Sequence, residues 1–351
     1  MPTGSGSAVN DAVPSPVDGP GLLGPRPEPT DPIRLGFQIW GQAVSWADLM
    51  AAGERVESLR FASLFANDHL MPILGDADGP VLGAHGPVFE GWMTLASWAT
   101  RTRRIPLGVL VCGVGYRNVG LTVKMATALD HASGGRAMLG LGAGWHEPEH
   151  RAFGYDVLPL RDRISRFDEA SALARAMLDG GAATQEGRWV RSHEATNDPP
   201  PVQARMPLLI GGSGEKRTLR IVARDADIWN GEGDPATFAR KNAILDDRCV
   251  EIGREPTEIR RTVGVPPVCI RDTRAAAVEA LGAILQTQGA PPAQARAWAA
   301  SSPLADTQDA VIRLLRAWRE AGAEEAVIDL PSPLDDETME RLAGPVRERL
   351  G

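Results

Sequence analysis

Cysteine is scarce in this sequence, and its scarcity excludes two kinds of architecture. The 351 residues include three cysteines, Cys112, Cys249 and Cys269, which lie far apart along the chain. Isolated cysteines provide neither a disulfide framework nor the short spacing of a zinc site. We therefore expect a protein that folds around an apolar core in a reducing compartment, the cytoplasm.

Long apolar runs and an excess of basic residues are also missing. No stretch approaches the ~18 apolar residues of a membrane span, and the chain does not start with the basic and apolar segments of a secretory signal. The 45 acidic residues outnumber the 37 basic ones, which gives a net charge of −8. That balance argues against a broad nucleic-acid surface. We expect a small-molecule substrate, and neither a membrane nor a nucleic acid, as the binding partner.

The composition divides the chain into a tail and one domain. Residues 1–31 are rich in Pro, Gly and Ser and contain almost no large apolar side chains, so we predict a disordered N-terminal tail. Over the whole chain, 43% of the residues are hydrophobic and 23% are charged, which is typical of a soluble globular protein. We predict that residues 32–351 form a single domain.

Eight apolar segments alternate with helical patterns in that domain. The predicted strands are residues 33–39, 59–66, 105–112, 137–141, 208–210, 227–229, 259–270 and 326–330. Alternation of this kind favours a parallel sheet, and eight repeats favour closure into an α/β (β/α)8 TIM barrel. Two longer connections, residues 72–87 and 185–207, are predicted as insertions after strands two and four, the second of them irregular.

A barrel brings together the residues that follow the carboxyl end of each strand. We therefore expect one site formed by Trp40, residues 67–69, 112–118, 142–146 and 211–214, and Trp229 with Asn230.

Two glycine-rich segments in this set suggest a cofactor pocket. Gly140, Gly142 and Gly144 alternate at the end of the strand predicted over residues 137–141. Without a Cβ atom, glycine reaches positive φ and lets a flat ring or a phosphate approach the backbone. Residues 211–214, Gly-Gly-Ser-Gly, follow a strand and open a basic helix, whose free amides suit a phosphate. The alternative for this second segment is a plain strand-to-helix turn.

His69 is the candidate catalytic residue, with Asp68 beside it. A histidine next to a carboxylate at the catalytic rim of a barrel can exchange a proton near neutral pH. The alternative is a hydrogen-bonded structural pair. We predict a functional role because both residues follow a barrel strand.

Residues 146–150, His-Glu-Pro-Glu-His, match the H-E-x-x-H pattern of zinc hydrolases. That pattern requires a helix that is already under way, so that both histidines share one face. Pro148 lacks an amide hydrogen and disfavours a helical Glu147. We therefore predict no metal site and keep a zinc hydrolase as a lesser alternative.

Taken in order, these motifs resemble the luciferase-like flavin and deazaflavin oxidoreductase family, and specifically its branch that uses coenzyme F420. The resemblance covers roughly residues 33–263. The matching segments are 67–69 (Asn-Asp-His), 107–111 (Leu-Gly-Val-Leu-Val), 116–118 (Tyr-Arg-Asn), 129–131 (Leu-Asp-His), 133–136 (Ser-Gly-Gly-Arg), 140–145 (Gly-Leu-Gly-Ala-Gly-Trp), 149–150 (Glu-His), 211–212 (Gly-Gly), 225–227 (Asp-Ala-Asp) and 229–230 (Trp-Asn).

The resemblance implies a luciferase-like barrel with F420 or FMN in its mouth. It further implies that His69 is the acid or base, and that a non-prolyl cis peptide lies within residues 109–113 behind the ring. The residues expected to bind the cofactor are Trp40, Asn67, Cys112, Gly113, Tyr116, Asn118, Gly142, Ala143, Gly144, Trp145, Gly211, Gly212, Ser213, Gly214 and Trp229.

Three positions depart from the family pattern. Residues 71–73 are Met-Pro-Ile where related dehydrogenases often carry a Trp, and Trp145 stands where the sugar-phosphate enzymes carry a carboxylate. Val119 replaces the usual proline after Asn118. The chemistry of those dehydrogenases therefore cannot be transferred as a whole.

We predict an F420-dependent oxidoreductase that moves a hydride between the deazaflavin and a small organic substrate, with His69 as general acid or base. The alternative is an FMN-dependent monooxygenase that uses O2 and reduced flavin from a partner reductase. A barrel that binds cofactor without turnover is a third interpretation. The family also implies a homodimer.

Overall fold

The computed structural model describes residues 28, 30–73, 87–331 and 334–351. Most of the predicted tail, residues 1–31, and most of the first predicted insertion, residues 72–87, lie outside these ranges. Within them, no helix has both the length and the apolar character needed to cross a membrane.

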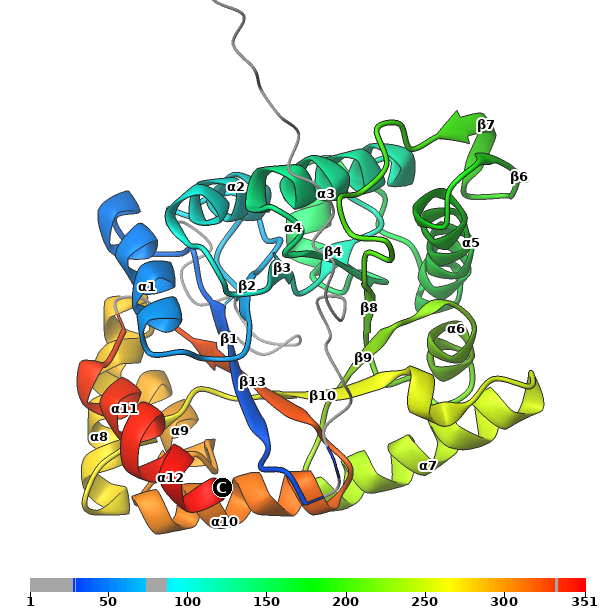
Figure 1. Cartoon of the computed structure of the whole chain (residues 1–351). Helices are drawn as coiled ribbons and strands as arrows, with labels where there is room; N and C mark the ends of the chain where they lie inside the picture. Colours follow the sequence, from blue (N-terminus) through cyan, green and yellow to red (C-terminus); the bar gives the residue numbers. More distant parts are fainter. Residues whose placement is uncertain (1–27, 29, 74–86, 332–333) are drawn as a thin grey trace, which may run out of the picture.

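The strands form a closed parallel barrel surrounded by helices, as predicted (Figure 1). In spatial order the strands run β3-β2-β1-β13-β10-β9-β8-β5-β4, and the pairing of β3 with β5 closes the ring. Their bounds are β1 (Arg34–Ile39), β2 (Leu64–Ala66), β3 (Leu107–Val109), β4 (Cys112–Gly113), β5 (Ala137–Gly142), β8 (Leu208–Gly211), β9 (Ile228–Gly231), β10 (Arg260–Val265) and β13 (Glu325–Leu330). Because β3 and β4 are two parts of the third barrel strand, the ring has eight strand positions.

Side chains cap the starts of several helices. Ser45 and Asn118 each accept a backbone N–H at the start of the following helix, from Asp48 and Leu121. The helices are α1 (Trp46–Ser58), α2 (Gly91–Arg101), α3 (Val119–Ser133), α4 (Glu147–Ala152), α5 (Leu160–Leu178), α6 (Thr218–Asp225), α7 (Pro235–Glu251), α8 (Arg274–Thr287), α9 (Pro292–Ser301), α10 (Gln308–Glu320), α11 (Asp336–Arg341) and α12 (Arg347–Leu350).

The second strand and the second insertion differ from their predictions. β2 begins at Leu64, because α1 extends to Ser58 and the chain then turns through Arg60 with φ 58°. An antiparallel hairpin of β6 (Ala182–Glu186) and β7 (Arg191–Thr196) overlaps the first part of the segment predicted as irregular, residues 185–207. Most of the hairpin side chains are exposed, so the hairpin has no apolar pattern that the sequence could reveal.

The third barrel strand is interrupted at Leu110–Val111, whose peptide bond is cis. The expected non-prolyl cis peptide within residues 109–113 is thereby confirmed. A Cβ atom on Gly140 would collide with the Val109 carbonyl oxygen, and one on Gly211 would lie 2.9 Å from Val111 Cγ1. These glycines therefore make room for the third strand.

The glycines of β5 thus also serve a purpose that we did not predict for them. Gly142 also faces the Val111 side chain, at 2.5 Å from the position of an added Cβ. Gly144 alone in this group has positive φ, at 76°. Close approach at β5 is real, but at Gly140 and Gly142 the approaching group is the neighbouring strand.

Gly140→Ala should destabilise the barrel by about 3 kcal/mol, because the added methyl group meets a buried backbone carbonyl that cannot move alone. Urea unfolding of the two proteins measures the difference. Gly344→Ala is the matched control, since nothing lies within 4 Å of its added Cβ. Equal unfolding midpoints for Gly140→Ala and the wild type would contradict the packing role.

Candidate functional site

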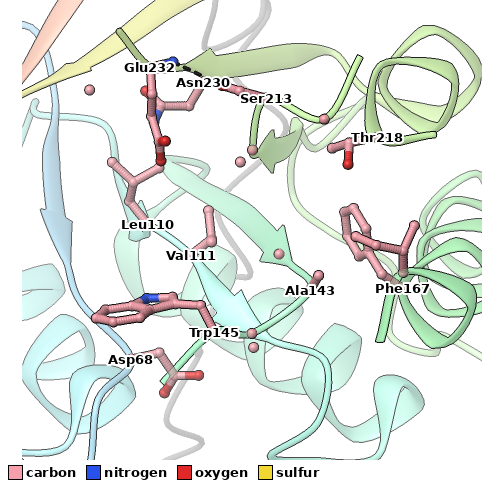
Figure 2. A pocket seen from close by; sticks show the side chains of 18 of the residues that line it. Asp68, Leu110, Val111, Ala143, Trp145, Phe167, Ser213, Thr218, Asn230 and Glu232 are labelled. Atoms are coloured by element: carbon pink, nitrogen blue, oxygen red, sulfur yellow. Dashed lines mark hydrogen bonds between the residues drawn. The ribbon is translucent and has the colours of Figure 1, made fainter. Parts of the chain in front are cut away.

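A cavity of about 1350 Å³ opens at the carboxyl ends of the barrel strands. Strand ends β1, β5, β8, β9, β10 and β13 all contribute to its lining, as the barrel prediction requires. Figure 2 shows Leu110, Val111 and Trp145 around one part of the cavity and Phe167 and Thr218 around another. The volume exceeds that of a typical single-ligand pocket and is sufficient for a cofactor together with a substrate.

Most of the predicted site residues line this cavity. They are Asp68, His69, Gly113, Tyr116, Gly142, Ala143, Gly144, Trp145, Gly211, Gly212, Ser213 and Gly214.

Two predicted tryptophans are buried behind the cavity wall. Trp40 stacks on Trp298 with ring centroids 6.0 Å apart. Trp229 stacks on Phe238 and donates its indole N–H to the Gly212 carbonyl oxygen. Both support the lining from behind and do not contribute to it.

Asn67, Cys112 and Asn118 also lie outside the lining. Asn67 and Cys112 are buried, and burial raises the pKa of the Cys112 thiol well above its ordinary value. Asn118 caps α3 by accepting the Leu121 N–H at 3.2 Å. Asn67 and Cys112 are next to lining residues in the sequence and Asn118 is two residues from Tyr116, yet none of the three belongs to the lining.

His69 is held by a carboxylate that is distant in sequence. Its Nδ1 lies 3.0 Å from Oε2 of Glu149, which is 80 residues away in the chain and fully buried. Glu149 also accepts hydrogen bonds from the Tyr116 hydroxyl and from the backbone N–H groups of Leu70 and Met71. Glu149 therefore joins three separate segments at one point.

These hydrogen bonds keep Glu149 ionised. Burial raises the pKa of its carboxyl group, but the hydrogen bonds from His69, Tyr116 and the backbone outweigh burial and lower the pKa overall. Burial and the neighbouring Glu149 raise the pKa of Tyr116, so its hydroxyl remains a donor.

Asp68 makes a different ion pair. Its Oδ2 lies 2.7 Å from Arg117 Nη1, and the same guanidinium contacts Glu90 at 2.8 Å. His69 therefore pairs with Glu149 and not with the adjacent carboxylate. Sequence reasoning could not identify this partner, although Glu149 stood within a segment that matched the family.

Residues 146–150 form the start of a short helix. α4 begins at Glu147 with Pro148 in its first turn, so Glu147 is helical although we predicted that Pro148 disfavours this. A first turn tolerates proline because the amide hydrogen there has no helical partner. His150 Nδ1 lies 2.9 Å from the Asp156 carbonyl oxygen, while His146 precedes the helix. Across the described chain, no group of three His, Cys, Asp or Glu side chains could hold a metal ion.

The second glycine segment forms a positively charged end of the cavity. Gly212 has φ 124°, and no side chain caps the start of α6. Arg161, Lys216 and Lys241 line this end, and none of them pairs with a carboxylate in the ranges that the structure covers. An uncapped helix start together with unpaired cations suits a phosphate or another anion.

Solved structures with the same fold include two oxidoreductases. An F420-dependent secondary alcohol dehydrogenase in complex with an F420-acetone adduct superposes with a TM-score of 0.74 at 16% identity, over 90% of this chain and 99% of that chain. A long-chain alkane monooxygenase gives a TM-score of 0.72 at 15% identity, over 91% of each chain. At these identities the likeness establishes the fold.

Curated relatives share more sequence. The F420-dependent glucose-6-phosphate dehydrogenase of Microbacterium testaceum is 28% identical over 234 residues, which are 66% of this chain and 66% of the relative. A phthiodiolone/phenolphthiodiolone dimycocerosates ketoreductase of Mycobacterium tuberculosis is 28% identical over 243 residues, 68% of this chain and 61% of the relative. The chain thus spans just under two thirds of the length of these two relatives.

A family model described as luciferase-like monooxygenase matches residues 31–330, which include every barrel strand and the complete lining of the cavity. The chain therefore belongs to the luciferase-like monooxygenase family.

Proposed function

We propose that this protein is an F420-dependent oxidoreductase that transfers a hydride between the deazaflavin and a small organic substrate, with His69 as general acid or base. One observation carries the proposal: His69 lines the cavity and is held there by the buried, ionised Glu149. The similarity to an F420-dependent dehydrogenase supports the choice of cofactor.

The His69–Glu149 pair fits the proton transfer that accompanies hydride transfer. Oxidation of an alcohol carbon releases a hydride and the hydroxyl proton, and reduction of a carbonyl takes up both. Because Glu149 holds Nδ1, the other ring nitrogen, Nε2, remains to meet the substrate oxygen. The Glu149 carboxylate stabilises the imidazolium that forms when His69 takes the proton.

The cavity has one region that suits the phosphate of F420 or FMN and another that suits the ring. When bound, either cofactor supplies the hydride chemistry. Lys216, Ser213 and the uncapped start of α6 would hold its phosphate, because Lys216 has no carboxylate partner in the described chain and the neighbouring Glu215 pairs with Arg240. Leu110 and Val111 would support its ring with an apolar surface.

An FMN-dependent monooxygenase is the second candidate. The family description and the fold of the long-chain alkane monooxygenase favour it. This reaction would use O2 and would require reduced flavin from a separate reductase. Both candidates use the same cavity, so binding measurements separate them better than motifs do.

Fluorescence titration of the full chain should give micromolar or tighter binding of F420 and weaker binding of FMN. Lys216→Ala should weaken F420 binding about ten-fold, because it removes an unpaired cation from the anion-binding end. Arg313→Ala, at an exposed position on α10, is the control and should bind like the wild type. Tight FMN binding with weak F420 binding would contradict the F420-dependent assignment and favour the FMN-dependent monooxygenase.

His69→Ala should lower kcat for F420-linked turnover by about 10² to 10⁴-fold, because the substrate oxygen loses its proton donor or acceptor. The dissociation constant of F420 should remain within about three-fold of the wild type, since the imidazole of His69 does not contribute a cation to the anion-binding end of the cavity. His193→Ala, on the exposed hairpin, is the matched control. Unchanged turnover in His69→Ala would overturn the assigned role.

Glu149→Gln should destabilise the protein at pH 7 by about 2 kcal/mol, because a buried charged acceptor is lost. The folded-state pKa of Glu149 lies below its ordinary value of 4.5, so this stabilisation is fully present above pH 4.5 and is lost as the pH falls through the folded-state pKa. Urea unfolding at several pH values should therefore show the difference narrowing in acid. Glu147→Gln, an exposed change on the same helix, is the control, and a difference independent of pH would contradict the prediction.

A further inference from the structure

Asp329 presents a fixed carboxylate to the cavity from the end of β13. Its Oδ1 accepts the indole N–H of Trp40 at 2.8 Å, and Trp40 is buried against Trp298. The Asp329 side chain belongs to the cavity lining, and its Oδ2 has no hydrogen-bond partner in the described part of the chain. One oxygen therefore orients the carboxyl group and the other remains free.

Asp329 differs from other carboxylates in the interior. Asp68, Asp227 and Glu324 each lie within 3.1 Å of an arginine nitrogen. No Lys or Arg nitrogen lies within 4.0 Å of Asp329 over the described ranges. A shielded carboxylate without a cation is unfavourable for folding, which makes a ligand-binding role the physical alternative.

The groups around Asp329 set its charge. Burial raises its pKa to about 6, and the charge of Glu232 acts in the same direction, whereas the Trp40 hydrogen bond and His69 oppose the rise. At neutral pH the carboxyl group is therefore mostly ionised. Its electrostatic coupling to His69 places it in the same part of the cavity as the proposed acid or base.

The cavity thus has two ends of opposite charge. Arg161 and Lys216 lie at the glycine-rich end, where the Glu232 N–H also donates to Ser213, and Asp329 supplies a carboxylate without a cationic partner in the described chain at the end of β13. Trp145 lies near His69, with ring centroids 5.7 Å apart, and adds an apolar surface to the lining. A substrate that suits this arrangement has an apolar body and a cationic group.

We propose that Asp329 recognises a protonated amino group of the substrate, so that the substrate is an amine-bearing alcohol or carbonyl compound. This inference rests on the proposed function, because it names the substrate class of the same site. The amino group would donate to Oδ2 of Asp329, and the reacting oxygen would lie toward His69.

Calorimetry with benzylamine, benzyl alcohol and benzoate as probes tests the proposal on the full chain, with and without bound F420. The wild type should bind benzylamine at least about ten-fold more tightly than benzyl alcohol, because the ammonium group makes a charge-assisted hydrogen bond to Asp329, whereas benzoate reports on the anion-binding end. Asp329→Asn should lose that preference, since asparagine keeps an acceptor for Trp40 but has no charge. Asp336→Asn, on α11 at the surface, is the matched control and should keep the preference.

Three outcomes would overturn the inference. They are no measurable binding of benzylamine, equal binding of benzylamine and benzyl alcohol, and a preference that survives in Asp329→Asn. A loss of F420 affinity in Asp329→Asn as large as the loss for benzylamine would also overturn it, because the carboxylate would then serve the cofactor. If the wild type does not bind F420, the proposed function is overturned. The binding of the three probes to the cofactor-free chain still tests the role of Asp329.

Discussion

The close passage of the third barrel strand against three glycines is the constraint on which the site depends. Gly140, Gly142 and Gly211 leave room for residues 109–111, and a side chain at any of them would displace that segment. The segment then turns Leu110 and Val111 into the cavity lining, while Gln38 donates to the Leu110 carbonyl oxygen from β1. One packing constraint thus sets the shape of an apolar wall.

The polar side of the site is arranged around Glu149. A fully buried carboxylate must find donors, and Glu149 finds them on His69, on Tyr116 and on the backbone after His69. These donors come from two connections, one after β2 and one after β4, and Glu149 itself follows β5. The same bonds that satisfy the carboxylate also fix the orientation of His69, so stability and proton chemistry share one set of contacts.

Charge is divided unevenly within the cavity. Arg117 neutralises Asp68, and His69 accompanies Glu149, whereas Lys216 at one end and Asp329 elsewhere have no partner of opposite charge over the described chain. Unpaired charges that face a cavity favour ligands of opposite charge. The pattern is consistent with an anionic cofactor group at the glycine-rich end and a cationic substrate group at Asp329.

The sequence by itself determined the features that depend on neighbours within a few residues. Eight apolar segments separated by helical patterns indicate the barrel, because burial follows local spacing. Only the tertiary structure decided which side chains meet. The pairing of His69 with Glu149, the exposed hairpin and the unpaired Asp329 each depend on how distant strand ends and helices are placed. Local periodicity carries no information about such contacts, since it records which face of an element is buried but not which side chain lies across from it.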